Sequence, residues 1–230
     1  MVKAVAVLFD MDGVLIDSNA VIERAWREAA GLYGKTISDD EMAKHIHGQP
    51  GPHTIKALFG DLPLADRQRV QQYIIDAENT ADYDPIPGVG KLISALHAAG
   101  VPVGIVTSGW RQKIDRVTAM LQVAHCISVI VERDDVARGK PHPDPYLLAA
   151  RRLAVPAEQT VVFEDSPSGI SAAVSAGACC IGIGGKALTE FGTTIAIADF
   201  TGVAVAARGE DEVVMSFGAE YALSIATSRP

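Results

Sequence analysis

Two aspartates, Asp10 and Asp12, directly follow a short apolar run at residues 4–9. An unbroken run of this kind, rich in alanine and valine, is typical of a strand buried on both faces of a parallel sheet. Ligands bind at the carboxyl ends of such strands, so we expect both carboxylates to face a crevice. Two like charges this close are costly unless a positive group joins them. The pair is therefore the first candidate for a functional site.

Two other interpretations apply to this segment. Aspartate and glycine also end strands for reasons of turn geometry alone. A calcium-binding loop is excluded, because the sixth position counted from Asp10 is Leu15, where the loop needs glycine, and the twelfth is Val21, where it needs a bidentate glutamate. The turn interpretation stays open until the rest of the chain is considered.

Apolar runs and helix-like segments alternate regularly after residue 88. We expect strands at 101–106, 127–131, 160–163 and 178–183, and helices at 89–99, 110–123, 144–153 and 166–176. This alternation predicts an α/β protein with a Rossmann-like parallel-sheet core and helices on both faces. At the end of the chain, 202–217 predicts a C-terminal β-hairpin, and 218–230 predicts a short helix or a frayed end.

The segment 18–84 interrupts the alternation. It contains helix-like stretches at 20–33, 39–45 and 64–80. No convincing strand is present in it, and polar and proline residues flank it on both sides. We therefore predict a small all-helical cap domain at 18–84, inserted into a core domain that comprises 1–17 and 85–230. Motion of the two linkers would open and close the site at Asp10.

Polar residues also stand near the ends of three later predicted strands. They are Ser108, Lys140 and the pair Glu164 and Asp165. Each alone has a common structural explanation, as a turn residue, a solvated lysine or a helix cap. The carboxyl ends of parallel strands meet at one sheet edge, so all of them can converge near Asp10. Together they offer a hydroxyl donor, a cation and carboxylates, which is a set suited to phosphate and a divalent metal.

Four ordered motifs, spread over nearly the whole chain, resemble those of the haloacid dehalogenase superfamily. They are Phe9-Asp-Met-Asp-Gly-Val-Leu-Ile-Asp-Ser18, Ile105-Val-Thr-Ser-Gly109, Gly139-Lys-Pro-His-Pro-Asp-Pro-Tyr146 and Phe163-Glu-Asp-Ser-Pro-Ser-Gly-Ile170. They are similar to the subgroup that carries a helical cap after the first motif. A dehalogenase would lack the second aspartate, so Asp12 points to phosphoryl chemistry.

The resemblance implies unequal roles for the acidic residues. Asp10 would attack phosphorus and form an aspartyl phosphate, whereas Asp12 would protonate the leaving oxygen and then take a proton from the attacking water. The resemblance also implies a Mg²⁺ site. Its ligands would be the carboxylates of Asp10 and Asp165 and the backbone carbonyl of Asp12, with Glu164 bound directly or through water.

The resemblance further implies how the phosphoryl group is held. Ser108 and Lys140 would bind its oxygens, and Lys140 would also offset the charge of the nucleophile during transfer. The backbone amides of Met11 and Gly109 would add donors. Gly109, which has no side chain, would let the ligand approach closely.

The cap segment 45–53 is expected to set substrate choice. It contains two glycines and two prolines, which predicts a loop over the leaving group. Its three histidines are a poor second metal site, because the oxygen site elsewhere is complete. We expect His47 or Gln49 to bind substrate hydroxyls. The pair His47-Gly48 resembles the wording of this segment in capped sugar and polyol phosphatases. This resemblance implies a Mg²⁺-dependent phosphatase that acts on small sugar or polyol phosphate monoesters.

Two alternative functions stay open. A sugar phosphomutase of the beta-phosphoglucomutase type needs a second phosphate site, for which Arg111 is the candidate cation. It also needs a hinge histidine, whose place Ile22 takes. A non-catalytic protein that binds phosphorylated metabolites would share only the fold. The complete set of motif residues argues against that alternative.

Composition limits the partners and the location of the protein. The 230 residues are 48% hydrophobic, and the formal net charge is -8. Nucleic acids and anionic membranes normally need clustered basic residues, so neither is an expected partner. The cysteines Cys126, Cys179 and Cys180 lack paired metal spacing and suit a reducing compartment. We therefore expect a cytoplasmic monomer whose partner is a small phosphorylated substrate.

Overall fold

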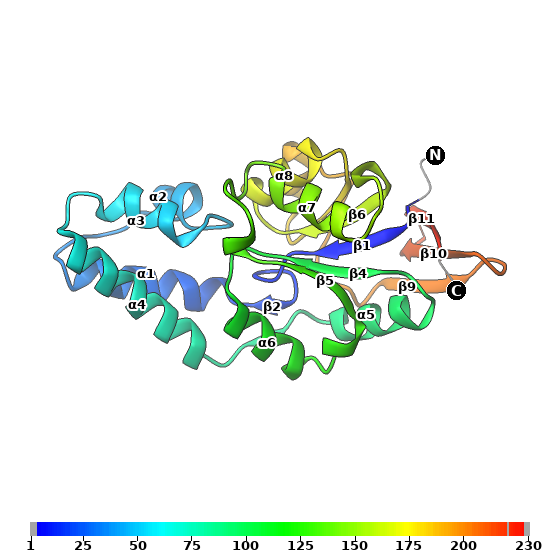
Figure 1. Ribbon diagram of the computed structural model, residues 1–230, viewed down its shortest axis with the longest axis horizontal. Helices are drawn as coiled ribbons and strands as arrows, with labels where there is room; N and C mark the ends of the chain where they lie inside the picture. Colours follow the sequence, from blue (N-terminus) through cyan, green and yellow to red (C-terminus); the bar gives the residue numbers. More distant parts are fainter. Residues whose placement is uncertain (1–3, 220, 228–230) are drawn as a thin grey trace.

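A six-stranded parallel sheet lies at the centre of the computed structural model, which describes residues 4–219 and 221–227 (Figure 1). The strands are β1 (Ala6–Phe9), β4 (Val103–Val106), β5 (Ile127–Val131), β6 (Thr160–Glu164), β7 (Cys179–Ile183) and β8 (Ile195–Ile197). Their order in the sheet is β5-β4-β1-β6-β7-β8. The residues that follow β1 therefore lie next to those that follow β4 and β6.

Helices cover both faces of this sheet (Figure 1). On one face lie α5 (Val89–Ala98) and α6 (Arg111–Met120), and on the other lie α7 (Asp144–Arg152) and α8 (Pro167–Ser175). Short 3-10 helices complete the connections: η1 (Ala124–Cys126), η2 (Arg133–Asp135), η3 (Ala157–Gln159) and η4 (Lys186–Phe191). The predicted α/β core is confirmed. Strand β8 was not predicted from the sequence, because three residues are too few to show a pattern.

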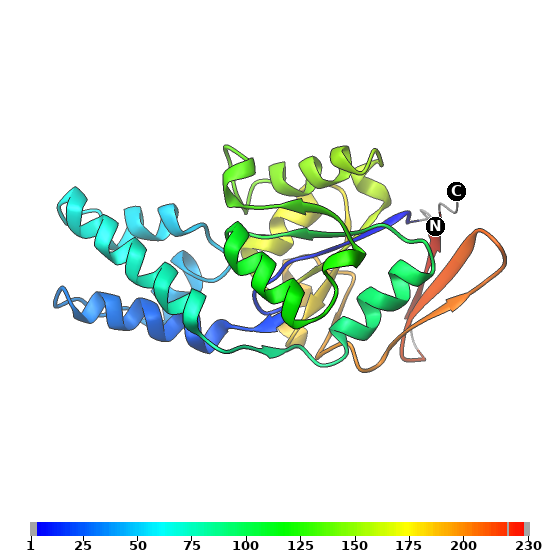
Figure 2. The same ribbon diagram turned by 60° about the horizontal axis from the view of Figure 1, so that its bottom comes forward.

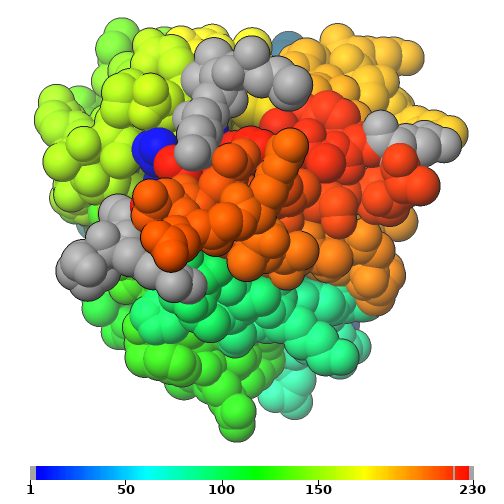
Figure 3. Space-filling model, turned by 90° about the vertical axis from the view of Figure 1, so that its right-hand side faces the viewer, coloured from blue at the N-terminus to red at the C-terminus, as the bar shows by residue number. Residues whose placement is uncertain are grey.

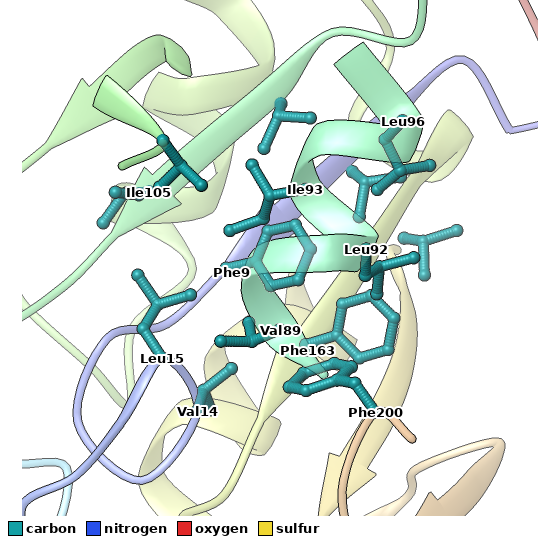
Figure 4. Packing of buried hydrophobic residues seen from close by; sticks show 14 of the residues in the cluster. Phe9, Val14, Leu15, Val89, Leu92, Ile93, Leu96, Ile105, Phe163 and Phe200 are labelled. Atoms are coloured by element: carbon teal, nitrogen blue, oxygen red, sulfur yellow. The ribbon is translucent and has the colours of Figure 1, made fainter. Parts of the chain in front are cut away.

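Both faces of β1 are buried, which explains its unbroken apolar sequence. Val7 and Phe9 belong to the apolar cluster under α5 and α6, whereas Leu8 belongs to the cluster under α7 and α8. The rings of Phe9 and Phe163 stack with centroids 5.0 Å apart. The ring of Phe200 meets Phe163 edge-on, and Figure 4 shows these three rings packed below α5. This packing fixes the backbone that leads into Asp10.

The inserted segment forms helices at the carboxyl end of the sheet (Figure 1). They are α1 (Asn19–Gly31), α2 (Asp39–His45), α3 (Gly51–Phe59) and α4 (Leu64–Thr80). They enclose an apolar cluster of their own that includes Trp26 and Phe59. The chain enters and leaves through β2 (Ile16–Asp17) and β3 (Asp84–Pro85), which pair antiparallel. The exact division into a cap domain and a core domain stays a prediction.

Helix α3 replaces part of the loop that the sequence predicts at 45–53. Gly51 and Pro52 lie in its first turn, where a proline costs no backbone hydrogen bond and its fixed φ angle suits the helix. The Thr54 hydroxyl donates to the carbonyl of His45 at 2.5 Å and joins α3 to the end of α2. Glycine and proline therefore mark a helix start here, and only 46–50 connect the two helices.

A three-stranded antiparallel sheet closes the end of the molecule opposite the inserted helices (Figure 2). It consists of β9 (Val203–Ala207), β10 (Glu212–Phe217) and β11 (Tyr221–Ala226). Figure 3 looks onto this end, where the orange and red atoms of this sheet spread across the surface. The buried side chains of Met215 and Ile225 join the core cluster.

The predicted hairpin is confirmed by β9 and β10, but the prediction of a helix or frayed end at 218–230 is wrong over β11. In β11, Ile225 is buried and Ala222 is exposed. The backbone of Ala4, at the start of the described chain, pairs with Ile225. Pairing with β10 and with the start of the chain thus stabilises the strand. Residues 220 and 228–230 lie outside the described part of the chain. Within that part, no helix combines the length and apolar character needed to cross a membrane.

Replacing Phe163 by alanine should lower the free energy of unfolding by about 3–5 kcal/mol, because its fully buried ring fills the centre of the core. Phe191→Ala is the matched control, since that ring is 48% exposed. We expect it to change stability by no more than about 0.5 kcal/mol. Urea unfolding curves measure both values, and equal losses would contradict this account of the core.

Candidate active site

Three adjacent strand ends bring the predicted residues together. Asp10 follows β1, and Ser108 lies just beyond β4. Glu164 ends β6, and Asp165 follows it. Phe9 pairs with residues of β4 and β6 at the same level, so the three segments leave the sheet side by side. The turn explanation of Asp10 is insufficient, because its side chain takes part in the contacts described next.

A buried lysine joins two of these carboxylates. The ammonium nitrogen of Lys140 lies 2.6 Å from Asp10 Oδ1 and 2.5 Å from Glu164 Oε1. Burial alone would lower the pKa of Lys140, but the two carboxylates raise it above its ordinary value, so the ammonium stays charged. Burial raises the pKa of Asp10 to about 7, although the Lys140 charge opposes this rise. Lys140 is thus the direct electrostatic partner of Asp10.

Tyr146 and Val106 complete the surroundings of this pair. The Tyr146 hydroxyl donates to Glu164 Oε1 at 2.7 Å, and Lys140 donates to the carbonyl of Val106 at 3.1 Å. These bonds satisfy polar groups that burial would otherwise leave without partners. Tyr146 had no predicted role, although it closes the quoted Lys140 motif, and only the packing of α7 against the sheet reveals its contact.

Three carboxylates meet at the edge of this network. Ligand oxygens of Asp10, Glu164 and Asp165 all lie within 4.8 Å of one another. Loss of solvent and repulsion from Asp10 and Glu164 raise the pKa of Asp165 well above its ordinary value. The side-chain amide of Asn19 donates to Asp165 at 3.2 Å but brings no charge. An oxygen-only set with this excess of negative charge fits a divalent cation.

Gly13 makes room for Asp165. Its φ angle is +71°, and a Cβ atom there would lie 1.9 Å from Asp165 Oδ2. Any other residue would be strained in this backbone conformation and would displace the carboxylate. Gly13, the glycine of the first motif, therefore leaves free the space that the Asp165 carboxylate occupies in the acidic cluster.

Asp12 lies in a separate network. Its Oδ1 atom accepts hydrogen bonds from the Ser18 hydroxyl at 2.6 Å and from the Lys113 ammonium at 2.5 Å. Lys113 also lies 2.6 Å from Glu78 Oε2, at the end of α4. Burial raises the pKa of Glu78. Lys113 and Glu78 were not predicted from the sequence, because a lysine and a glutamate in amphipathic helices are usually solvated.

A cleft lies between the inserted helices and these strand ends. Asp10, Asp12, Ser108 and Asp165 line its floor. Apolar side chains of the inserted helices line the opposite wall: Ile22, Trp26, Ile46, Ile55, Ile74 and Ile75. Polar groups on this side are few and include His47, Gln49 and Gln71. The cleft therefore presents carboxylates at one end and a largely apolar wall with a few hydrogen-bonding groups at the other.

The connection between α2 and α3 touches the floor of the cleft. The Ser108 hydroxyl donates to the carbonyl of Gly48 at 3.5 Å, so this connection reaches one of the predicted phosphate-binding residues. His47, directly before it, contacts Glu23 Oε1 at 3.0 Å through its Nε2 atom. Both predicted cap residues, His47 and Gln49, line the cleft.

Two residues that were predicted to bind the substrate, Gly109 and Arg111, have partners within the protein. The Gly109 amide donates to the hydroxyl of Thr107 at 3.0 Å, although Gly109 lines the cleft. Arg111 lies on α6 with 60% of its side chain exposed and pairs with Asp115. The structure does not bring it to the cleft. Arg133 lines the cleft instead, and it was not predicted from the sequence because it begins the short 3-10 helix η2, outside the four motifs.

The chain belongs to the haloacid dehalogenase-like hydrolase family, whose model matches residues 7–183. Hexitol phosphatase A of Escherichia coli is 34% identical over 184 residues, which cover 79% of this chain and 84% of that protein. The phosphorylated carbohydrates phosphatase of Thermotoga maritima is 34% identical over 177 residues, covering 75% and 81%.

Solved structures share the same architecture. CbbY from Rhodobacter sphaeroides in complex with phosphate superposes with a TM-score of 0.71 at 26% identity, covering 86% of this chain and 95% of that one. A beta-phosphoglucomutase from Clostridium difficile reaches a TM-score of 0.74 at 21% identity, covering 86% and 92%. At that identity, the likeness to the mutase shows the fold alone.

Asp165→Asn should abolish the stabilisation of the protein by a divalent cation, tested with Mg²⁺, because it removes one of the three clustered carboxylates. At a concentration of about 100 times Kd, Mg²⁺ should stabilise the wild type by ~2.7 kcal/mol, which raises its Tm by about 5–10 °C. Asp61→Asn, at a largely exposed aspartate in the turn between α3 and α4, should keep the full shift. Thermal unfolding with and without Mg²⁺ measures this, and equal shifts in both variants would contradict a cation site at Asp165.

Proposed function

We propose that the protein hydrolyses small sugar or polyol phosphate monoesters through an aspartyl-phosphate intermediate. The observation that carries this proposal is the different environment of the two neighbouring aspartates. Asp10 pairs with Lys140 inside the acidic cluster, whereas Asp12 belongs to a separate network and lines the cleft. One carboxylate can therefore act as a nucleophile while the other transfers protons. The named phosphatases among the relatives support the same reaction.

Asp10 is the proposed nucleophile. Its carboxylate would attack phosphorus in line and form an aspartyl phosphate, which divides one difficult displacement into two easier ones. Lys140, held 2.6 Å away, would favour the ionised form of Asp10 against the effect of burial and would offset charge during transfer. Ser108 would bind a phosphoryl oxygen together with the amides of Met11 and Gly109. The Ser108 hydroxyl and the Gly109 amide would exchange their present partners for the substrate.

Asp12 is the proposed general acid and base. It would protonate the leaving sugar or polyol oxygen and then take a proton from the water that attacks the phosphoenzyme. A well-placed group of this kind contributes ~10²–10⁴-fold to the rate. Its side chain is 25% exposed, so it can reach both the leaving group and water in the cleft.

Mg²⁺ is the proposed cofactor. Asp10 and Asp165 would bind it with their carboxylates, Asp12 with its backbone carbonyl, and Glu164 directly or through water. Oxygen ligands of this kind are the ones that Mg²⁺ prefers. When bound, the ion would neutralise negative charge on the phosphoryl oxygens and on the carboxylates around them.

The inserted helices are proposed to select the leaving group. His47 and Gln49 would bind substrate hydroxyls, while the isoleucine-rich wall would pack against the carbon skeleton. This wall and the acidic floor line the same cleft, so the space between them suits a small substrate. We also propose a cytoplasmic monomer, because the described cysteines are free thiols and one chain provides every residue of the site.

The phosphomutase alternative has less support. It needs a cation for a second phosphate, and Arg111, the cation considered for this role, pairs with Asp115 outside the cleft. Ile22 lines the cleft where the mutase pattern has a histidine. A protein that only binds phosphorylated metabolites would have no need of the Asp12 network.

Asp10→Asn should lower phosphate release from a hexitol or hexose phosphate with Mg²⁺ to below ~1% of the wild-type rate, because the amide cannot replace the nucleophile. Asp12→Asn should lower kcat by about 10²–10⁴-fold. The control Asp17→Asn, at an exposed aspartate in the same segment, should retain the wild-type rate. Substantial activity in either of the first two variants would overturn the assigned roles.

His47→Ala should change the relative rates across hexose, pentose, hexitol and glycerol phosphates by about 2–10-fold, because one hydrogen bond to a substrate hydroxyl contributes ~0.5–1.5 kcal/mol. His97→Ala is the matched control, since that histidine lies in α5 on the sheet core. A phosphate-release screen of both variants measures the ratios. An unchanged pattern in His47→Ala would remove this residue from substrate selection.

A further inference from the structure

A buried lysine outside the four family motifs connects three parts of the molecule. Lys113 lies in α6 and is 1% exposed. Its ammonium contacts Asp12 in the loop after β1 at 2.5 Å and Glu78 in α4 at 2.6 Å. The rings of Tyr83 and Trp110 flank the same ammonium, with centroids 5.3 and 5.8 Å away. A lysine this deeply buried stays charged only beside a negative partner, and Lys113 has two.

The two carboxylate oxygens of Asp12 differ in the hydrogen bonds that they accept. The Lys113 ammonium and the Ser18 hydroxyl both donate to Oδ1. Among residues 4–219 and 221–227, no side chain or backbone group donates to Oδ2. Two donors on one oxygen fix the orientation of the carboxylate, because each restricts a different direction of motion. Asp12 lines the cleft, so Oδ2 stays available to a ligand there.

A purely structural role explains less of this geometry. Lys113 would balance the buried charge of Glu78 without any contact to Asp12, because one carboxylate is enough to neutralise one ammonium. Asp12 is less buried than Glu78, with 25% of its side chain exposed against 7%, so solvation could satisfy it in part without Lys113. Charge balance therefore does not require the second contact, to Asp12, and the consequence of that contact is the fixed orientation of the Asp12 carboxylate.

We propose that Lys113 is a positioning residue that holds Asp12 in the orientation required for proton transfer, while Glu78 anchors Lys113 from the inserted helices. This inference rests on the proposed function, in which Asp12 is the general acid and base. Lys113 does not touch the substrate in this account. Replacing Lys113 should therefore lower the rate only when Asp12 is present, and comparing the two backgrounds measures this dependence.

The test compares Lys113 variants in two backgrounds. Lys113→Met alone leaves two carboxylates without their cation and can fail to fold, so the key variant is Lys113→Met combined with Glu78→Leu, which replaces the ion pair by apolar side chains of similar size. With Asp12 present, the double variant should lower kcat for a hexitol phosphate about 10²-fold and change KM by less than about threefold. The matched control is Asp76→Asn, at an exposed carboxylate of α4 outside this network, which should keep kcat within about threefold.

In the Asp12→Asn background, the same double substitution should lower kcat by less than about threefold, because the group that Lys113 positions is already lost. Equal losses in the two backgrounds would overturn the inference and leave a structural role for Lys113. A double variant that is folded and retains wild-type kcat would also overturn it. If the wild type itself releases no phosphate, the proposed function fails instead, so the two failures are distinguishable.

Discussion

The site depends on the compensation of negative charge at the end of a buried sheet. Asp10, Glu164 and Asp165 are brought within 4.8 Å of one another because β1 and β6 are neighbours and end at the same level. Such a group is unstable on its own, since burial and mutual repulsion disfavour ionised carboxylates. Lys140 offsets part of this charge from the loop before α7, and the remaining excess on Asp165 defines the place for a divalent cation.

Two lysines from different elements give the two aspartates different surroundings. Lys140 pairs with Asp10 in the floor of the cleft, whereas Lys113 pairs with Asp12 at its side. The sequence spacing of Asp10 and Asp12 does not by itself distinguish them, because both follow the same strand. The distinction arises from tertiary contacts. Glu78 extends the second network into α4, so the inserted helices contact Lys113 as well as lining the cleft.

Much of the core could be predicted from the sequence, because strands buried on both faces are continuous apolar runs and helices end at glycine. Strand β5 and helices α2 and α4 have the predicted bounds. Helix α3 was missed because glycine and proline at a helix start resemble loop residues, and β11 because it is stabilised by pairing with distant segments. The four motifs located the acidic floor. Lys113, Glu78 and Asn19 carry no local signal, since their roles depend on which helices meet around the cleft.

The central claim is that Asp10 becomes phosphorylated while Asp12 completes the turnover. The most direct measurement is peptide mapping by mass spectrometry of the acid-quenched Asp12→Asn variant after incubation with an aryl phosphate and Mg²⁺. An aryl oxygen leaves without being protonated, so this variant still forms the phosphoenzyme but hydrolyses it slowly. This account predicts one added phosphoryl group on the peptide that contains Asp10, and none in Asp10→Asn. A wild type that releases phosphate while the slowed variant carries no phosphoryl group, or carries it on another residue, would contradict the account.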